Sequence, residues 1–150
     1  MVISPSTQAM EEDRPPGGTA LRYSASWDAG ALRIADARHA VCAFLDRAGH
    51  PPGQQVSQDA QMVVSELITN AVRHAPGPCG LLLELPSAAD LLRVTVWDTS
   101  ARLPQPQPRD VRRVGGHGLL LVAALCERIL VAPVDGGKRV TAELPLSPAG

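Results

Sequence analysis

Three polar side chains recur at four-residue intervals in the stretch Ser65 to Ala75, which otherwise has the composition of a buried helix. They are Glu66, Asn70 and His74, so a helix of 3.6 residues per turn places them in one row at the edge of its apolar face. Because this row borders the core, it could line a functional site if other features of the sequence support one. The alternative is a solvated helix flank with one hydrogen-bonded histidine at the border of the core.

Two further polar features stand at the ends of apolar segments. Asp98 ends a segment that is otherwise typical of a core strand, and its carboxylate could accept a hydrogen bond from an exocyclic amino group. Gly116 and Gly118 precede an apolar helix, so the backbone could approach an anion closely and direct amide groups at it. Each feature also has a structural explanation, because Asp often opens a turn and glycines often end a loop.

The elements that must position these residues follow from hydrophobic periodicity and turn residues. Alternation predicts a strand over TALRYSASW, and helical periodicity predicts helices from about Asp28 to Gly49 and from about Ser57 to Ala75. The apolar segments CGLLLEL and LLRVTVWD are joined by a polar turn, as in an antiparallel hairpin. A long loop, a third helix from Gly116 or His117, and strands around RILVAPV and KRVTAELPL complete the prediction.

The order of these elements predicts the fold class and the domain organisation. Tight turns between consecutive strands favour a mostly antiparallel, mixed sheet with its helices on one face, an α/β two-layer sandwich. Residues 1–18 contain Ser, Pro, Gly and acidic residues without apolar periodicity and are expected to form a disordered tail. The sequence therefore predicts one domain over residues 19–146 and a short C-terminal tail at 147–150.

Composition excludes several classes of protein. The net charge is -1, so no broad basic surface indicates direct nucleic-acid or membrane binding. Cys42, Cys79 and Cys126 lie among apolar neighbours without metal-ligand spacing, which favours packing in a reduced, cytoplasmic protein. The start of the chain lacks the pattern of a signal peptide, and no segment reaches the roughly 20 apolar residues of a spanning helix.

The order of the motifs is more specific than any one of them. ExxxN in a helix, Asp at a strand end and GxG-Leu opening a helix together resemble the GHKL superfamily, whose Bergerat-type ATP-binding fold is shared by gyrase-type topoisomerases, sensor histidine kinases and heat-shock chaperone ATPases. The resemblance extends from about Thr19 to Leu146. SELITNAVRHA, VWDTS and GGHGLLLVAALCERI are most similar to the single-domain anti-sigma-factor serine/threonine kinases.

The resemblance implies ATP and Mg²⁺ as cofactors and gives roles to the helix residues. Asn70 matches the asparagine whose oxygen helps to hold Mg²⁺, and Glu66 matches the candidate general base for an incoming hydroxyl. Arg73 lies where related kinases often have a basic residue near the phosphates, although its angle of about 60° from Asn70 also fits a solvent-facing arginine. His74 matches a frequent family histidine and is expected to shape the pocket.

The other implied ATP contacts surround a lid. Asp98 would accept a hydrogen bond from the adenine amino group and select ATP over GTP. Four residues at the start of the third helix are assigned to the nucleotide: Gly116, His117, Gly118 and Leu119. The glycines would admit the phosphates, and the leucine would close the turn against the core. The loop from Thr99 to Gly115 would be the lid, whose arginines would approach polyphosphate or a partner, or remain solvated: Arg109, Arg112 and Arg113.

Two positions depart from the family pattern. Ser100 stands where glycine is common in an Asp-x-Gly motif, so a small residue is kept without glycine's backbone freedom, and the adenine contact is expected to survive. Arg139 stands where the last strand usually has a threonine, and Thr141 follows two residues later. The sequence leaves open whether a hydroxyl of this strand reaches the nucleotide.

The resemblance also suggests how such a domain would act. We expect an ATP-binding regulatory protein, an anti-sigma factor with serine/threonine kinase activity that phosphorylates a STAS-type anti-anti-sigma partner and can hold a sigma factor. Homodimerisation is a further expectation of the family. A noncatalytic nucleotide-binding adaptor that controls a protein partner is the alternative, and a simple ATP hydrolase is a third interpretation, because a fold does not fix a function.

Overall fold

The computed structural model describes residues 19–28, 34–74, 78–86, 90–99, 118–134 and 136–146. The predicted tails at 1–18 and 147–150 lie outside these ranges, as does most of the predicted lid. Within the ranges the elements are, in chain order, β1 (Thr19–Trp27), α1 (Ile34–Arg47), α2 (Gln55–His74), β2 (Cys79–Pro86), β3 (Leu91–Asp98), α3 (Gly118–Leu125), β4 (Arg128–Val134) and β5 (Gly137–Pro145).

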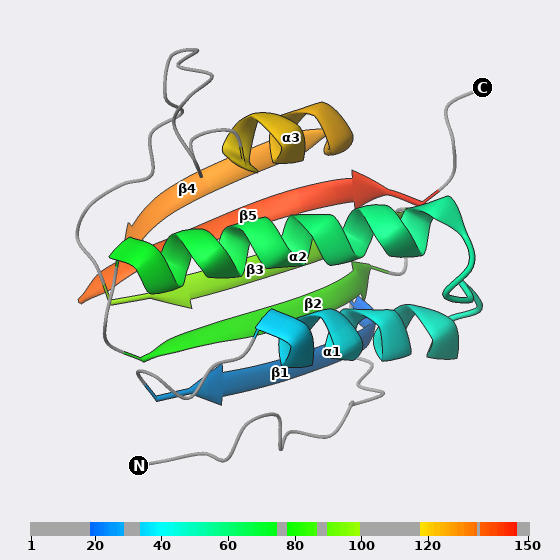
Figure 1. The fold of residues 1–150 in the computed structure, drawn as a ribbon, viewed down its shortest axis with the longest axis horizontal. Helices are drawn as coiled ribbons and strands as arrows, with labels where there is room; N and C mark the ends of the chain where they lie inside the picture. The colour runs from blue at the N-terminus through cyan, green and yellow to red at the C-terminus, as the bar shows by residue number, and fades with distance from the viewer. Residues whose placement is uncertain are drawn as a thin grey trace.

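The strands form one sheet in the order β1-β2-β3-β5-β4. Every neighbouring pair of described strands is antiparallel, so the parallel pairing that a mixed sheet would contain is absent from this part of the chain. The helices cover one face of the sheet (Figure 1). The predicted α/β two-layer sandwich with an antiparallel sheet is therefore confirmed.

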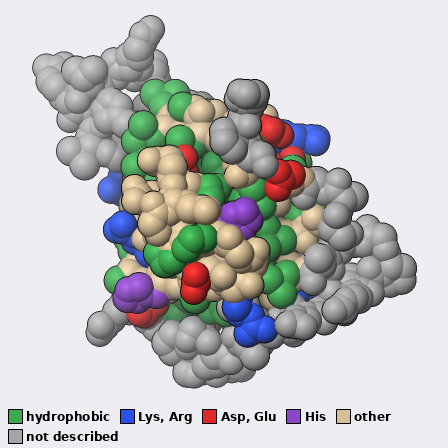
Figure 2. All heavy atoms as spheres, turned by 90° about the vertical axis from the view of Figure 1, so that its right-hand side faces the viewer, with side chains coloured by type: hydrophobic (Ala, Val, Ile, Leu, Met, Phe, Trp, Pro, Cys, Tyr) green, Lys and Arg blue, Asp and Glu red, His purple; other side chains and the backbone are tan. Residues whose placement is uncertain are grey.

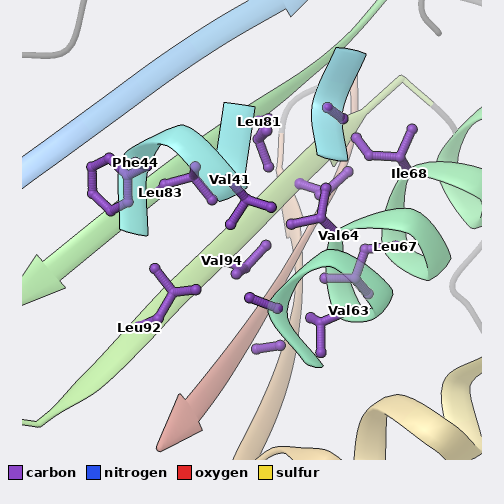
Figure 3. Packing of buried hydrophobic residues seen from close by; sticks show 14 of the residues in the cluster. Val41, Phe44, Val63, Val64, Leu67, Ile68, Leu81, Leu83, Leu92 and Val94 are labelled. Atoms are coloured by element: carbon purple, nitrogen blue, oxygen red, sulfur yellow. The ribbon is translucent and has the colours of Figure 1, made fainter. Parts of the chain in front are cut away.

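The core lies between the helices and the inner face of the sheet. Leu92, Val94 and Val96 alternate along β3 and are buried, as the period of two in a strand requires. Side chains from helices α1 and α2 and from strands β2 and β3 meet there (Figure 3). The buried residues of α2 are Ser57, Ala60, Val63, Val64, Leu67, Ile68 and Ala71. Because a fully buried Leu or Val stabilises the fold by about 1.5–3 kcal/mol, this packing fixes the rotation of α2.

A glycine ends α1 and turns the chain toward α2. Gly49 has a φ of 98°, and its amide donates to the carbonyl of Asp46 at 3.1 Å. The amide of His50 donates to the carbonyl of Leu45 at 2.8 Å. These two bonds form a Schellman motif, which satisfies carbonyls at the helix end and favours glycine at the left-handed position. The predicted end near Gly49 is confirmed.

The outer face of the sheet carries several paired polar side chains. Arg93 lies between two acidic neighbours, with its Nε 3.1 Å from Oε2 of Glu143 and a guanidinium nitrogen 3.8 Å from Oε1 of Glu84. Thr95 and Thr141 share a hydrogen bond of 3.2 Å between their hydroxyls. Cross-strand pairs of this kind suit a sheet that is covered on one face only.

The cysteines Cys42, Cys79 and Cys126 are free thiols. Cys79 is buried, whereas Cys42 and Cys126 are half-buried. No helix in the described part of the chain is both long enough and apolar enough to cross a membrane.

Candidate nucleotide site

The C-terminal half of α2 presents the predicted polar row. Glu66 and Asn70 are half-buried, one turn apart, beside the buried Leu67 and Ala71. Arg73 is exposed. Since buried neighbours anchor the helix, the carboxylate and the carboxamide keep a fixed position at the border of the core.

His74 is the last residue of α2. Its side chain lies outside the described part of the structure, so its predicted role stays a prediction.

Asp98 is the last residue of β3 and faces the helix layer. It continues the alternation of the buried Val94 and Val96 and is itself buried. Its cross-strand partner on β5 is Lys138. The Nζ of Lys138 donates to Oδ2 of Asp98 at 2.7 Å, and the two side chains are only 1% and 2% exposed. The predicted base-reading carboxylate is therefore one half of a buried ion pair.

A glycine lets the two strands approach at this point. A Cβ added to Gly137 would collide with the backbone carbonyl of Asp98. Because glycine has no Cβ, the start of β5 lies close against the end of β3. This proximity brings the ammonium of the next residue, Lys138, within hydrogen-bonding distance of the carboxylate.

A row of buried side chains crosses the sheet at this end. Trp27 pairs with Cys79 across β1 and β2, and both residues are buried on the same face as Asp98. Burial, and secondly the nearby charge of Asp98, raise the pKa of the Cys79 thiol to about 11. The thiol is therefore protonated at neutral pH and is a packing group, not a nucleophile. The indole Nε1 of Trp27 is buried without a hydrogen-bond partner.

Cys126, after α3, is similar in this respect. Burial, and secondly the charge of Asp59, raise the pKa of its thiol to about 12. Both values support the predicted packing role of Cys79 and Cys126.

The elements that carry the predicted residues converge at one end of the molecule. Figure 1 shows the C-terminal ends of α2 and β3 and the start of β5 at the same end of the sheet. Asn70, near the C-terminal end of α2, and the Asp98–Lys138 pair therefore lie toward the same end of the sheet, and Glu66 lies one turn before Asn70. At the opposite end, acidic and basic side chains are dispersed over an otherwise apolar and neutral surface (Figure 2).

Several predicted contacts fall where the structure gives no description. Gly118 is the first residue of α3 and Leu119 follows it, but their side-chain environments are not described. The remaining predicted contacts and lid arginines lie outside the described residues: Ser100, Arg109, Arg112, Arg113, Gly116 and His117. Their assigned roles stay predictions.

The strand register resolves the question about the last strand. Arg139 pairs with Trp97, and Thr141 pairs with Thr95. Both side chains lie on the outer face of the sheet, whereas Asp98 lies on the helix face. Arg139 contributes there to a concavity of about 390 Å³ whose lining includes Arg22, Ser24, Ser26, Thr95 and Trp97. Neither Arg139 nor Thr141 therefore lies on the helix side, where the family threonine would contact a nucleotide.

Lys138 is the site residue that the sequence interpretation missed. The signal was present, because Val140, Ala142 and Leu144 are apolar at every second position, which places Lys138 on the core face. The same alternation places Asp98 on the core face of β3. Only the register, which the sequence does not supply, joins the two charges.

The residues present fit a magnesium nucleotide. No group of three or more His, Cys, Asp or Glu side chains that could hold a metal occurs among the described residues. A magnesium ion bound mainly by phosphates and water needs only one or two protein oxygens, which the carboxamide of Asn70 can supply. The buried Asp98–Lys138 pair combines a hydrogen-bond acceptor with a donor.

Comparison with known proteins identifies the family. The model of the histidine kinase-like ATPase domain matches residues 28–144. The chain therefore belongs to this family, and the predicted GHKL superfamily is confirmed, while the anti-sigma branch is not distinguished by the match.

Among solved structures, the chain is similar to the histidine kinase domain of the blue-light activated histidine kinase from Erythrobacter litoralis EL346. The identity is 19% and the TM-score 0.47, and the match covers 79% of this chain and 64% of that one. The chain thus spans less than two thirds of the length of that kinase domain. No match was found among curated proteins.

Proposed function

We propose that this chain is an ATP-binding regulatory protein with serine/threonine kinase activity, acting as an anti-sigma factor on a STAS-type anti-anti-sigma partner. The observation that carries the proposal is the half-buried pair Glu66 and Asn70 in the C-terminal half of α2, a helix that ends at the same end of the sheet as β3 and its last residue, Asp98. Membership of the histidine kinase-like ATPase family supports the ATP-binding part. The kinase activity and the partner are the finer parts of the proposal.

The chemistry assigns one task to each side chain of α2. Asn70 would supply an oxygen to Mg²⁺, which bridges and neutralises the phosphates of ATP when bound. Glu66, one turn earlier on the same face, would accept the proton of the incoming hydroxyl or orient that hydroxyl. Because the buried face of α2 fixes both side chains relative to β3, the nucleotide and the acceptor would meet a rigid wall.

Phosphate transfer to a partner tests the proposal. Purified STAS-type protein is incubated with the chain and γ-labelled Mg-ATP, and the label on the STAS protein is measured. Glu66→Gln is expected to reduce transfer by about 10²–10⁴-fold, the usual contribution of a general base. Asn70→Ala should also abolish transfer, whereas the exposed Arg38→Ala on α1 should not change it.

A noncatalytic adaptor is the alternative function. Its support is the concavity on the outer face, whose lining includes Arg22, Arg139 and Trp97 on the side away from the candidate nucleotide site. Such a surface could bind a protein partner without chemistry. Transfer that persists in both α2 variants would contradict the assigned roles. Nucleotide binding without any transfer would favour the adaptor.

A further inference from the structure

We infer that Lys138 is a base-recognition residue, which places a hydrogen-bond donor beside the Asp98 acceptor and lets the site accept guanine as well as adenine nucleotides. The inference rests on the proposed nucleotide-binding function and concerns the part of the site that meets the base. It differs from the expectation that Asp98 alone selects ATP over GTP.

The geometry makes the two side chains one recognition unit. Asp98 and Lys138 are directly opposite each other on neighbouring antiparallel strands. The contact between Nζ and Oδ2 is 2.7 Å long, and both groups are buried on the helix side. A base that contacts the carboxylate from this side therefore comes within reach of the ammonium too.

The ammonium of Lys138 has more N–H donors than its hydrogen bond to Asp98 uses. A lysine ammonium carries three N–H donors and no acceptor, whereas a carboxylate offers about four lone-pair sites. Asp98 accepts one of the three donors, and the structure gives Lys138 no second hydrogen-bonding side chain among the described residues. Because a buried donor without a partner is costly, a ligand that brings an acceptor to this position gains a hydrogen bond.

The edges of the two purines explain the predicted tolerance. Adenine presents its 6-amino donor next to the N1 acceptor, and guanine presents its O6 acceptor next to the N1–H donor. A carboxylate alone pairs with the adenine amino group and repels the guanine carbonyl. The Asp98–Lys138 pair contains one acceptor and one donor. The 6-amino group and N1 of adenine would therefore contact Asp98 and Lys138 respectively, whereas the N1–H and O6 of guanine would contact Asp98 and Lys138 respectively.

Calorimetric titration of Mg-ATP and Mg-GTP into the full chain tests this inference. In the wild-type protein the Kd for GTP should lie within about tenfold of the Kd for ATP. Lys138→Met removes the donor, and the ratio of the two Kd values should rise by about tenfold or more. Arg139→Met, the adjacent position on the outer face, should leave the ratio unchanged, and Lys138→Arg, which keeps a donor, should preserve much of the tolerance.

A second measurement needs no substitution, so it remains decisive if Lys138→Met fails to fold. An ATP analogue with carbon in place of N1 keeps the 6-amino group but lacks the acceptor for Lys138, and should bind the wild-type protein about tenfold more weakly than ATP. Equal affinity for this analogue and ATP, or an ATP preference of a hundredfold or more in the wild type, overturns the inference while leaving ATP binding intact. Failure of both nucleotides to bind overturns the proposed function and this inference with it.

Discussion

Lys138 and Asp98 set the chemical character of one end of the core. An isolated buried charge would be strongly unfavourable, and pairing at 2.7 Å offsets that cost. Buried ion pairs of this kind seldom add net stability compared with apolar residues of similar size. The pair is therefore weak evidence for added stability of the fold, and the proposed recognition of a polar ligand would give it a function.

The neighbouring thiol gives a prediction about pH. The pKa of Cys79 is raised from its ordinary value of 9.0 to about 11, so between these values the folded protein keeps a proton that the unfolded chain loses. Stability that is fully present below pH 9 is then lost as the pH rises toward 11. The decrease in the thermal unfolding midpoint from pH 8 to pH 10.5 should be smaller in Cys79→Ala than in the wild type. Parallel pH slopes in the two proteins would contradict this assignment.

At the scale of the elements, close approach between β2 and β3 depends on a glycine. A Cβ added to Gly80 would collide with the indole ring of Trp97, its cross-strand neighbour. Gly80→Ala is expected to destabilise the protein by about 1–3 kcal/mol, the usual cost of overpacking. Denaturant unfolding should detect the loss. Gly53→Ala is the matched control, because an added Cβ there meets nothing within 4 Å, and equal stability of the two variants would show that Trp97 moves aside freely.

Most elements were predictable from local patterns. The strand TALRYSASW and the segment LLRVTVWD match β1 and β3 because their alternation and their flanking turns are strong. Helix α2 begins at Gln55 instead of near Ser57, a difference within the usual uncertainty of helix ends. Gly49 explains why the end of α1 was well placed, whereas the start predicted near Asp28 was wrong, because Asp28 is not helical and α1 spans Ile34–Arg47.

The candidate site was less predictable than the fold. The row of Glu66 and Asn70 could be found because a helix fixes the relation between residues four apart. The partner of Asp98 is 40 positions away in the sequence, and sequence patterns do not give strand register. The alternation of Val140, Ala142 and Leu144 already indicates that Arg139 and Thr141 face away from the core, but it does not show which residues of β3 they oppose.

At the scale of the whole molecule, the two faces of the sheet have separate uses. The helix face carries the core and, at one end, the candidate nucleotide site, while the outer face carries paired charges and a concavity near Trp97. A bound nucleotide and a protein partner on the outer face would therefore not compete for the same surface. Both β3 and β5 contribute residues to the two faces, through Asp98 and Trp97 on one strand and Lys138 and Arg139 on the other, so these two strands could link them.

Calorimetric titration of ATP into the full chain, with and without Mg²⁺, tests the central claim that this end of the molecule binds a magnesium nucleotide. The wild-type protein should show saturable binding that Mg²⁺ strengthens, and Asn70→Ala should lose that strengthening while it retains the affinity measured without the metal. The exposed Arg38→Ala serves as the control and should behave as the wild type. Absence of saturable binding in the wild type, or an unchanged response to Mg²⁺ in Asn70→Ala, would contradict the account.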